Sequence, residues 1–422
     1  MKDQIKDKMG TTGLIFNEPL LWEKGSPGRT GISLPKRDVD EAPLDKQLVG
    51  DGPDFPDLSE LDVVRHFTKL SQWNFGVDSG MYPLGSCTMK YNPKTNERQA
   101  SLPGFAGAHP LLPERLSQGI LSLMFELQHL LGEITGLPAV TLQPAAGSHG
   151  ELTGMMVIDA FMKSTGQRRT KVLIPDTAHG TNPASAALCG LKAIPLKSNE
   201  KGILSTENVA ELMDEDTAGI MVTNPNTLGL FDENICEVAD IVHKAGGLLY
   251  YDGANLNAIM GISRPADMGF DIMHLNLHKT FSTPHGGGGP GGGPVGVIRE
   301  LVAYLPGPLP VKTNGVYGWE TPEQSIGRIH SFHGNIGVII RAYAYILSMG
   351  AAGLRQASET AVLNANYVMH KLKNVYHLPY DRPCMHECVL SAQNQKEQGV
   401  SAMDIAKGLL DYGIHPPTVY FP

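Results

Sequence analysis

The sequence contains few cysteines, few charged residues and no basic run, and each of these absences excludes a class of protein. Five scattered cysteines in 422 residues do not form a disulfide framework, so we expect a reducing compartment, the cytoplasm. Charged residues make up 18% and hydrophobic residues 41%, which excludes a disordered chain. The net charge of -9 argues against nucleic acid as a partner.

Signals for a membrane or a metal are also weak. Residues 1–10 mix charges and lack an apolar stretch, so they are not a signal peptide. The one long apolar stretch, residues 336–354, carries Arg341 and three small breaks, and we interpret it as a buried helix, with no membrane partner. Cys384 and Cys388 flank His386, but no second Cys or His pair completes four ligands, so no metal is predicted.

What the sequence does contain is much glycine and proline, 48 and 30 residues, and a clear change of pattern along the chain. Residues 1–95 are rich in both and predict an N-terminal arm with one helix over residues 58–70. Residues 96–330 predict a large α/β domain, which opens with a long helix over residues 116–134. Residues 331–422 predict a long helix and a smaller C-terminal domain.

Short apolar runs alternate with helical segments from residue 139 onward, which predicts a mainly parallel sheet with helices on both faces. The predicted strands are residues 139–142, 171–174, 193–196, 219–223, 247–251, 272–275 and 295–298. The predicted helices are residues 148–164, 184–189, 206–213 and 233–245. Ligands of such sheets bind at the carboxyl ends of the strands, so the loops there are the candidate site.

Two of these loops carry candidate ligand groups. After the first strand, Gly147 and Ser148 precede a helix, where free N–H groups and a hydroxyl can bind an anion. A plain turn with a capping serine is an equally good interpretation. After the second strand, the imidazole of His179 could stack on a flat cofactor, although a lone histidine is more often structural.

The next two loops add a hydroxyl and a carboxylate. Thr223 begins a polar loop that suits ligand contacts or a simple turn. Asp252 ends a buried apolar strand, which is costly unless the carboxylate has a partner. Gly253 and Ala254 follow it and leave room for a flat group against the backbone, but Asp252 could equally cap the next element.

The loop after residue 275 carries Lys279 beside His278, ahead of the glycine-rich run of residues 286–293. A lysine in this setting could form a Schiff base, because partial burial frees its amine. A surface lysine is the alternative. The glycines follow the lysine, so the segment is not a Walker loop, and no ribose-binding acid makes it a Rossmann motif.

The order of these weak signals is more informative than any one of them. An anion-binding turn, a histidine, an aspartate and a lysine, each at a strand end, match the needs of pyridoxal 5'-phosphate (PLP). In such a site the turn binds the phosphate, the histidine stacks on the ring, the aspartate keeps the ring nitrogen protonated and the lysine holds the aldehyde.

Six motifs closely resemble the glycine decarboxylase P-protein of the glycine cleavage system. They are MYPLGSCTMKYNPK, LQPAAGSHGELTG, DTAHGTNPASAA, NPNTLGLFD, YYDGANLNAI and NLHKTFSTPHGGGGPG. The resemblance runs from about residue 14 to residue 422, and the length is similar to subunit 2 of the split bacterial form. The family continues past residue 422 by some tens of residues, so we expect this chain to be a fragment.

The resemblance implies a fold-type-I PLP enzyme, similar to aspartate aminotransferase, and assigns roles to the matching residues. Lys279 would form the Schiff base, with His179 and Asp252 as the other catalytic residues. The cofactor-binding residues would be Gly147, Ser148, His179, Thr223, Asp252, Ala254, His278 and Lys279. The loop Gly85–Lys90 would cover the site or serve the subunit interface. The glycine-rich run would line a channel or, as we slightly favour, pack closely at a subunit contact.

The reaction implied is decarboxylation of glycine with transfer of the aminomethyl group to the lipoyl arm of the carrier H-protein. The implied partner is the homologous subunit 1, in an α2β2 heterotetramer. A glutamate-type decarboxylase or a cysteine desulfurase would share the Asp, His and Lys but lack PLGSCTMK and GGGGPG. A non-catalytic subunit of the same fold is the rival from another class, and it would have no reason to retain all three residues.

Overall fold

The structure is a computed structural model that describes residues 18–81, 83–84, 87–285 and 291–419. Contacts divide the chain into two compact units. One comprises residues up to 82 with residues 405–417, and the other comprises residues 83–404 with residues 418–422. The predicted boundaries at residues 95 and 330 stay predictions.

The second unit is built on a seven-stranded sheet with the strand order β3-β9-β8-β7-β6-β4-β5. Its strands are β3 (Ala139–Thr141), β4 (Lys171–Pro175), β5 (Lys192–Leu196), β6 (Thr217–Thr223), β7 (Leu248–Gly253), β8 (Ile272–Leu275) and β9 (Val295–Val297). All seven predicted strands are therefore confirmed. Only the pairs of β9 with β3 and β8 are antiparallel, and the other pairs are parallel.

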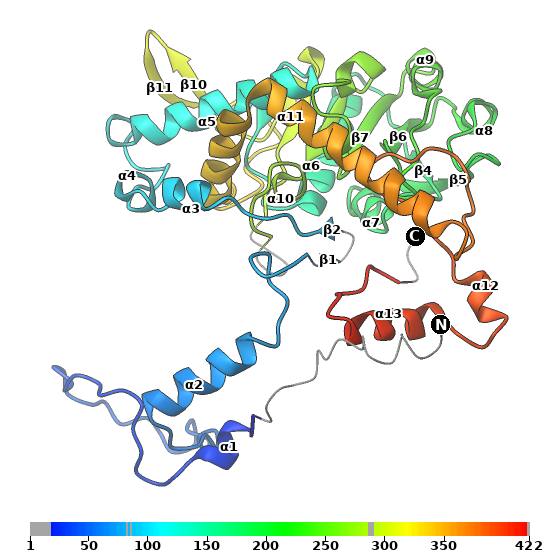
Figure 1. Cartoon of the computed structure of the whole chain (residues 1–422). Coiled ribbons are helices and arrows are strands. Elements are labelled where there is room, and N and C mark those ends of the chain that lie inside the picture. The colour runs from blue at the N-terminus through cyan, green and yellow to red at the C-terminus, as the bar shows by residue number, and fades with distance from the viewer. Residues whose placement is uncertain (1–17, 82, 85–86, 286–290, 420–422) are drawn as a thin grey trace. The chain divides into compact units, whose positions relative to one another are not determined.

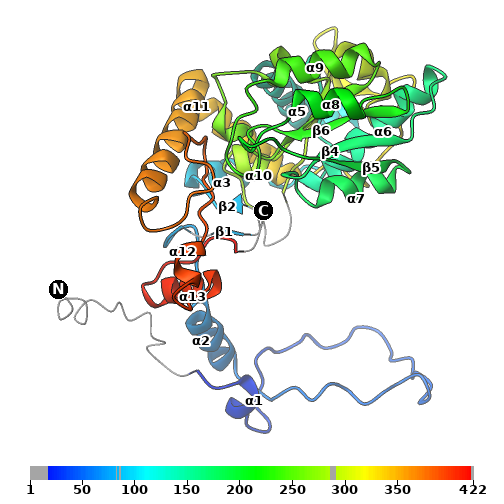
Figure 2. The ribbon, with the colours of Figure 1, turned by 90° about the vertical axis from the view of Figure 1, so that its right-hand side faces the viewer.

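Helices cover both faces of this sheet, as predicted. One face packs on α6 (Gly147–Ser164) and α7 (Thr181–Leu188), and the other on α5 (Glu114–Thr135), α8 (Thr206–Leu212), α9 (Ile235–Lys244) and α11 (Ile336–Leu372). Figure 2 shows α8 and α9 on one side of β4, β5 and β6, and α7 on the other. Helix α7 begins three residues earlier than predicted, because Pro183 fits the first turn of a helix.

Helix α5 forms because its apolar residues recur at helical spacing and bury one stripe. Leu123, Leu127 and Leu131 are buried in the core between α5 and the sheet, whereas Leu116, in the first turn, is 57% exposed. The helix ends at Gly136, whose φ of 79° is the left-handed conformation of a C-terminal cap.

Helix α11 is the predicted long helix after residue 331, and it buries one face only. Val338, Ile340 and Ile346 are buried, whereas Leu347 and Leu363 are 58% and 69% exposed. Among the described residues it is the one helix with the length and apolar content of a membrane span, a property that core helices share. Its regular conformation breaks at Gly350, where φ is 60°.

Strands β10 (Leu309–Thr313) and β11 (Val316–Glu320) form a hairpin that packs on α5 and was not predicted (Figure 1). Asn314 and Gly315 connect them with φ values of 51° and 84°. An Asn-Gly pair between two apolar segments is a strong hairpin signal, because both residues tolerate positive φ. The remaining elements of this unit include β1 (Pro83–Leu84), β2 (Cys87–Thr88), α3 (Lys94–Ala100), α4 (Pro103–Ala106), α10 (Leu277–Thr280) and α12 (Gln393–Lys396).

The first unit contains α1 (Leu21–Lys24) and α2 (Glu60–Ser71), and α13 (Ala402–Asp411) spans the division between the units. Helix α2 confirms the helix predicted over residues 58–70, and Ser59 caps it by accepting from the Asp62 N–H. Among the described residues 18–81, only His66 is buried. This segment therefore has almost no core of its own.

Candidate active site

Three polar side chains lie at one level of the sheet, at the carboxyl ends of β6, β7 and β8. In the strand register Thr223 pairs with Asp252, and Asp252 pairs with His274. All three are buried, with exposures of 4%, 2% and 1%. Because side chains alternate along a strand, they share the face on which α6 packs.

The Asp252 carboxylate has two polar neighbours, one of which is a hydrogen-bond donor. The Ala254 N–H donates to Asp252 Oδ1 over 3.0 Å, and His274 Nε2 lies 3.4 Å from the same oxygen. On its other side His274 Nδ1 lies 2.7 Å from the Tyr250 hydroxyl. The strand-end carboxylate thus has the partners that its burial requires, and Ala254 is the small half-buried residue beside it.

Thr223 differs from Asp252 in having an unsatisfied polar atom. Its Oγ1 is buried and has no hydrogen-bond partner among the described residues. A buried hydroxyl without a partner is costly, so it suits a ligand oxygen or ring group at this level of the sheet.

The N-terminus of α6 opens toward the same strand ends. No side chain caps it, Ser148 is exposed in its first turn, and Gly147 is half-buried. A β-carbon at Gly147 would lie 2.7 Å from the Asn276 side chain, so a larger residue there would require Asn276 to shift. An uncapped helix N-terminus with a free hydroxyl is suited to binding a phosphate.

His179 lies immediately before α7 and is half-buried. Burial lowers the pKa of its imidazole, the Asp252 charge raises that pKa, and the Lys279 charge lowers it. Both charges therefore act on His179, which means that these three predicted residues lie near one another.

Lys279 is half-buried on the short helix α10, directly after β8. Its neighbour His278 is buried, and its Nδ1 accepts from the Gly292 N–H over 3.4 Å. Burial, with the nearby His285 and Lys279, lowers the pKa of His278 to about 3. His278 is therefore neutral, and it packs under the backbone of Gly291 and Gly292.

The described part of the glycine-rich run packs closely. A β-carbon at Gly293 would lie 2.0 Å from the Ala146 carbonyl oxygen, and one at Gly291 would lie 2.6 Å from His278. Gly293 also donates its N–H to the Pro144 carbonyl over 3.0 Å. Close backbone approach explains glycine at these two positions. Residues 286–290 lie outside the described residues.

Sequence reasoning missed Glu151, which is 4% exposed on α6. Its carboxyl group meets the Thr181 and Ser185 hydroxyls at 2.8 and 3.3 Å. Burial, with the charge of Asp252, raises the pKa of Glu151 to about 7. The available signal was an acidic residue one turn into a helix, at helical spacing from Met155 and Ile158, which are buried.

Glu151, Asp252 and His274 each offer a ligand atom, and these atoms lie within 4.8 Å of one another. This is a candidate metal group within the described residues, although no metal was predicted. Hydrogen bonds account for the same three side chains, since Asp252 accepts from the Ala254 N–H, His274 bonds Tyr250 and Glu151 bonds two hydroxyls.

Two charged residues reach the site from outside the sheet, and sequence reasoning assigned them no individual role. Lys90 Nζ lies 3.2 Å from Cys87 Sγ, and burial lowers the Lys90 pKa. Glu387 accepts from Asn255 Nδ2 over 3.3 Å; burial raises its pKa to about 7, and the charges of Lys279 and Lys90 oppose that rise. In the loop predicted to cover the site, Gly85 and Ser86 lie outside the described residues.

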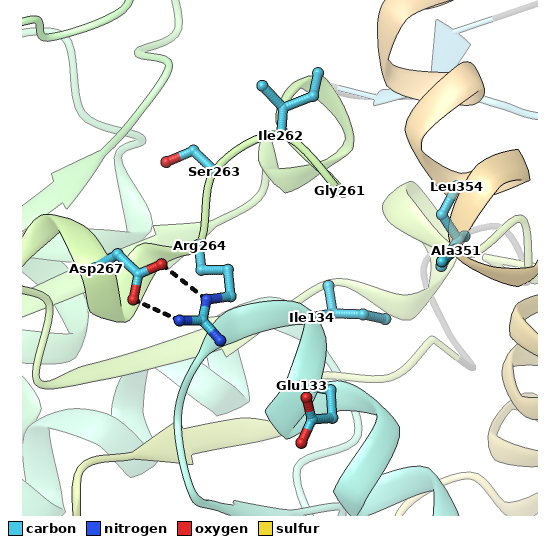
Figure 3. Close-up of a pocket in the computed structure, with 9 residues that line it drawn as sticks. All are labelled: Glu133, Ile134, Gly261, Ile262, Ser263, Arg264, Asp267, Ala351 and Leu354. Carbon is cyan, nitrogen blue, oxygen red and sulfur yellow. Dashed lines mark hydrogen bonds and ion pairs between the residues drawn. The ribbon is translucent and has the colours of Figure 1, made fainter.

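A pocket of about 390 Å³ opens elsewhere in this unit, between the end of α5, the loop over residues 261–267 and α11. Figure 3 shows the Arg264 guanidinium directed at the Asp267 carboxylate, which it bonds through two contacts of 2.8 Å. None of the predicted site residues lines this pocket. It is thus distinct from the strand-end cluster.

Comparison with known proteins gives a consistent result. The family model "Glycine dehydrogenase, C-terminal domain" matches residues 357–422. A probable glycine dehydrogenase (decarboxylating) subunit 2 from Bacillus licheniformis is 56% identical over 413 residues, which cover 96% of this chain and 85% of the relative. The protein of the same description from Desulforamulus reducens is 57% identical over 416 residues, 96% of this chain and 86% of the relative.

Solved structures agree on the fold. A glycine decarboxylase (P-protein) of the glycine cleavage system, in inhibitor-bound form, has a TM-score of 0.72 at 21% identity and covers 88% of this chain and 85% of its own. A cysteine desulfurase from Thermococcus onnurineus has a TM-score of 0.57 at 16% identity, covering 77% and 81%. The fold is that of the fold-type-I PLP enzymes, as predicted.

Proposed function

Because the chain belongs to the family of glycine dehydrogenase (decarboxylating) subunit 2, we propose that it is the PLP-dependent subunit that decarboxylates glycine and transfers the aminomethyl group to a lipoyl carrier. The main support for this proposal is that four features lie at the same edge of the sheet. They are the buried Asp252 carboxylate, the unpaired Thr223 hydroxyl, Lys279 and the uncapped N-terminus of α6.

The residues present fit PLP. Gly147 and Ser148 at the α6 N-terminus, with His278, would hold the phosphate, since α6 has uncapped N–H groups there. The Thr223 hydroxyl, which has no hydrogen-bond partner among the described residues, would bond the ring oxygen. His179 would stack on the ring, and small Ala254 leaves room beside it.

The chemistry that PLP supplies when bound is an electron sink for the electron pair left by the departing carboxylate. Asp252 would lie at the ring nitrogen and hold its proton there, with Oδ1 fixed by the N–H of Ala254. Lys279 would supply the amine that holds the aldehyde of the cofactor.

In the proposed reaction, the bonds that break are matched by bonds that form. The bond between glycine Cα and its carboxylate breaks and releases CO2, and Cα forms a bond to one lipoyl sulfur. The lipoyl disulfide breaks, and its second sulfur takes a proton. The lipoyl group is therefore the electron acceptor, and a protein-borne arm must reach the site.

The proposed partners are glycine, the lipoylated H-protein and the homologous subunit 1 in an α2β2 heterotetramer, in the cytoplasm, with no nucleic acid or membrane. The exposed apolar side chains of residues 18–81 support a protein partner. Ile32, Leu34 and Val39 are 72%, 80% and 73% exposed, and contact with a partner subunit would cover them.

The test uses the chain purified with its partner subunit. We expect a yellow protein whose cofactor absorption band disappears in Lys279→Ala and persists in the control Lys163→Ala, an exposed lysine of α6. Exchange of labelled bicarbonate into glycine should require the lipoylated carrier. A colourless wild type would contradict PLP, and exchange without any carrier would favour an ordinary decarboxylase.

A further inference from the structure

A chain of short contacts connects His179 to Glu151. His179 Nδ1 lies 2.7 Å from Thr181 Oγ1, and Thr181 Oγ1 lies 2.8 Å from Glu151 Oε1. The Ser185 hydroxyl lies 3.3 Å from the second carboxyl oxygen, Glu151 Oε2, and donates to it. Glu151 lies on α6, and Thr181 and Ser185 lie on α7, so helices fix the carboxyl group and both hydroxyls, whereas His179 lies in the turn before α7.

The direction of these bonds follows from counting protons at Thr181. Its backbone N–H donates to His179 Nδ1 over 3.3 Å, so Nδ1 presents a lone pair and carries no hydrogen. The Thr181 hydroxyl, 2.7 Å from the same nitrogen, must therefore donate its only proton to Nδ1. That proton is then not available for Glu151 Oε1.

We propose that Glu151 is a positioning residue that carries a proton on Oε1 and, through Thr181, fixes the neutral tautomer of His179 with its hydrogen on Nε2. Its action on the cofactor through His179 rests on the proposed function. The opposite arrangement has a Glu151 carboxylate and a hydrogen on Nδ1. It would direct that hydrogen and the Thr181 N–H toward each other, which is repulsive.

The surroundings of Glu151 favour the neutral acid. Burial, followed by the charge of the Asp252 carboxylate, raises its pKa to about 7, against the Ser185 hydroxyl and the Lys279 charge, which lower it. The titratable groups that face it are Asp252 and Tyr250 of β7, His274 of β8, Lys279 of α10 and His179. Below about pH 7 Glu151 carries its proton. Above about pH 7 Glu151 is a carboxylate, the Thr181 hydroxyl donates to it, and the hydrogen of His179 lies on Nδ1.

The first test measures the Glu151 proton itself, in the whole chain with and without cofactor. Infrared difference spectra between wild type and Glu151→Gln should contain the carbonyl stretch of a buried carboxylic acid at about pH 6. The glutamine keeps the shape and can donate to Thr181 while accepting from Ser185. Loss of this band should follow titration through about pH 7, and absence of the band at pH 6 would overturn the proposal.

The second test asks whether the proton is relayed through Thr181. In the complex with the partner subunit, the cofactor absorption of wild type and Thr181→Ser should shift with pH near 7, because both retain the hydroxyl. Thr181→Val and Glu151→Gln should lose that shift. If Thr181→Val retains it, the relay is wrong.

Failure of this inference can be distinguished from failure of the proposed function. A wild type without cofactor absorption would refute the proposed function, whereas the infrared band of Glu151 does not depend on the cofactor.

Discussion

The unit that carries the candidate site and the N-terminal segment, residues 18–81, differ in how far their apolar side chains are buried. In the former, large side chains such as Tyr250, Tyr251 and Phe281 are fully buried, and the strand-end residues Asp252 and His274 have hydrogen-bond partners. In the latter, apolar side chains such as Leu34 and Phe55 are 80% and 71% exposed. The comparison teaches that one region has a large core of its own, whereas the other buries almost none of its apolar side chains.

Truncating a large side chain should separate the two regions most. Leu127→Ala removes a fully buried residue of α5 and should lower the free energy of unfolding by about 2–5 kcal/mol. Leu34→Ala, at 80% exposure, should change it by less than about 0.5 kcal/mol. Chemical denaturation of both variants measures this. An equal loss in the two would mean that the N-terminal segment does have a core.

Adding one carbon should give a smaller contrast. A β-carbon at Gly154 would lie 2.3 Å from the buried Tyr250 ring, so Gly154→Ala should cost about 1–3 kcal/mol of unfolding free energy despite the better helix propensity of alanine. At Gly50 nothing lies within 4 Å, so Gly50→Ala should be nearly neutral. Thermal unfolding compares the two, and a neutral Gly154→Ala would show that Tyr250 can move.

The last contrast is in the dependence of stability on pH, whose slopes should have opposite signs in the two regions. Burial raises the pKa of Asp232 to about 7, so the stability from its protonation is complete below the unfolded value and is lost as pH rises to about 7. Asp232→Asn should remove a slope of at most about 1.4 kcal/mol per pH unit. Denaturation at several pH values between about 4 and 7 measures it.

Glu18, in the N-terminal segment, should respond in the other direction. Lys24 and Lys69, followed by His66, lower its pKa to about 2, so its stabilising effect is present above the unfolded value and is lost as pH falls toward 2. Glu18→Gln should abolish this acid sensitivity, which amide exchange of residues 18–24 can follow. A loss of protection on raising the pH instead would reverse the comparison.

The sequence predicts those features that depend on local pattern. Apolar runs identified all seven strands of the large sheet, and helical spacing identified α5 and α6. The hairpin of β10 and β11 was missed even though Asn314 and Gly315 carry a local signal for it.

The network behind the candidate site could not be predicted in the same way. Glu151 and Asp252 are 101 residues apart in sequence, and their proximity depends on which helix packs over which strand. His274 is one polar residue within a buried strand, and its role depends on its strand neighbours. Local periodicity contains neither kind of information, because both arise from tertiary packing.

The register of the three central strands has a consequence for how this protein can change. Thr223, Asp252 and His274 share a face only because their strands are aligned at one level. A slip of β7 by one residue would present Tyr251, which belongs to the opposite face, in place of the carboxylate. Substitutions along these strands alter single contacts, whereas a single insertion or deletion would remove the whole constellation at once. Strand length should therefore be the most restricted feature of this sequence during its evolution.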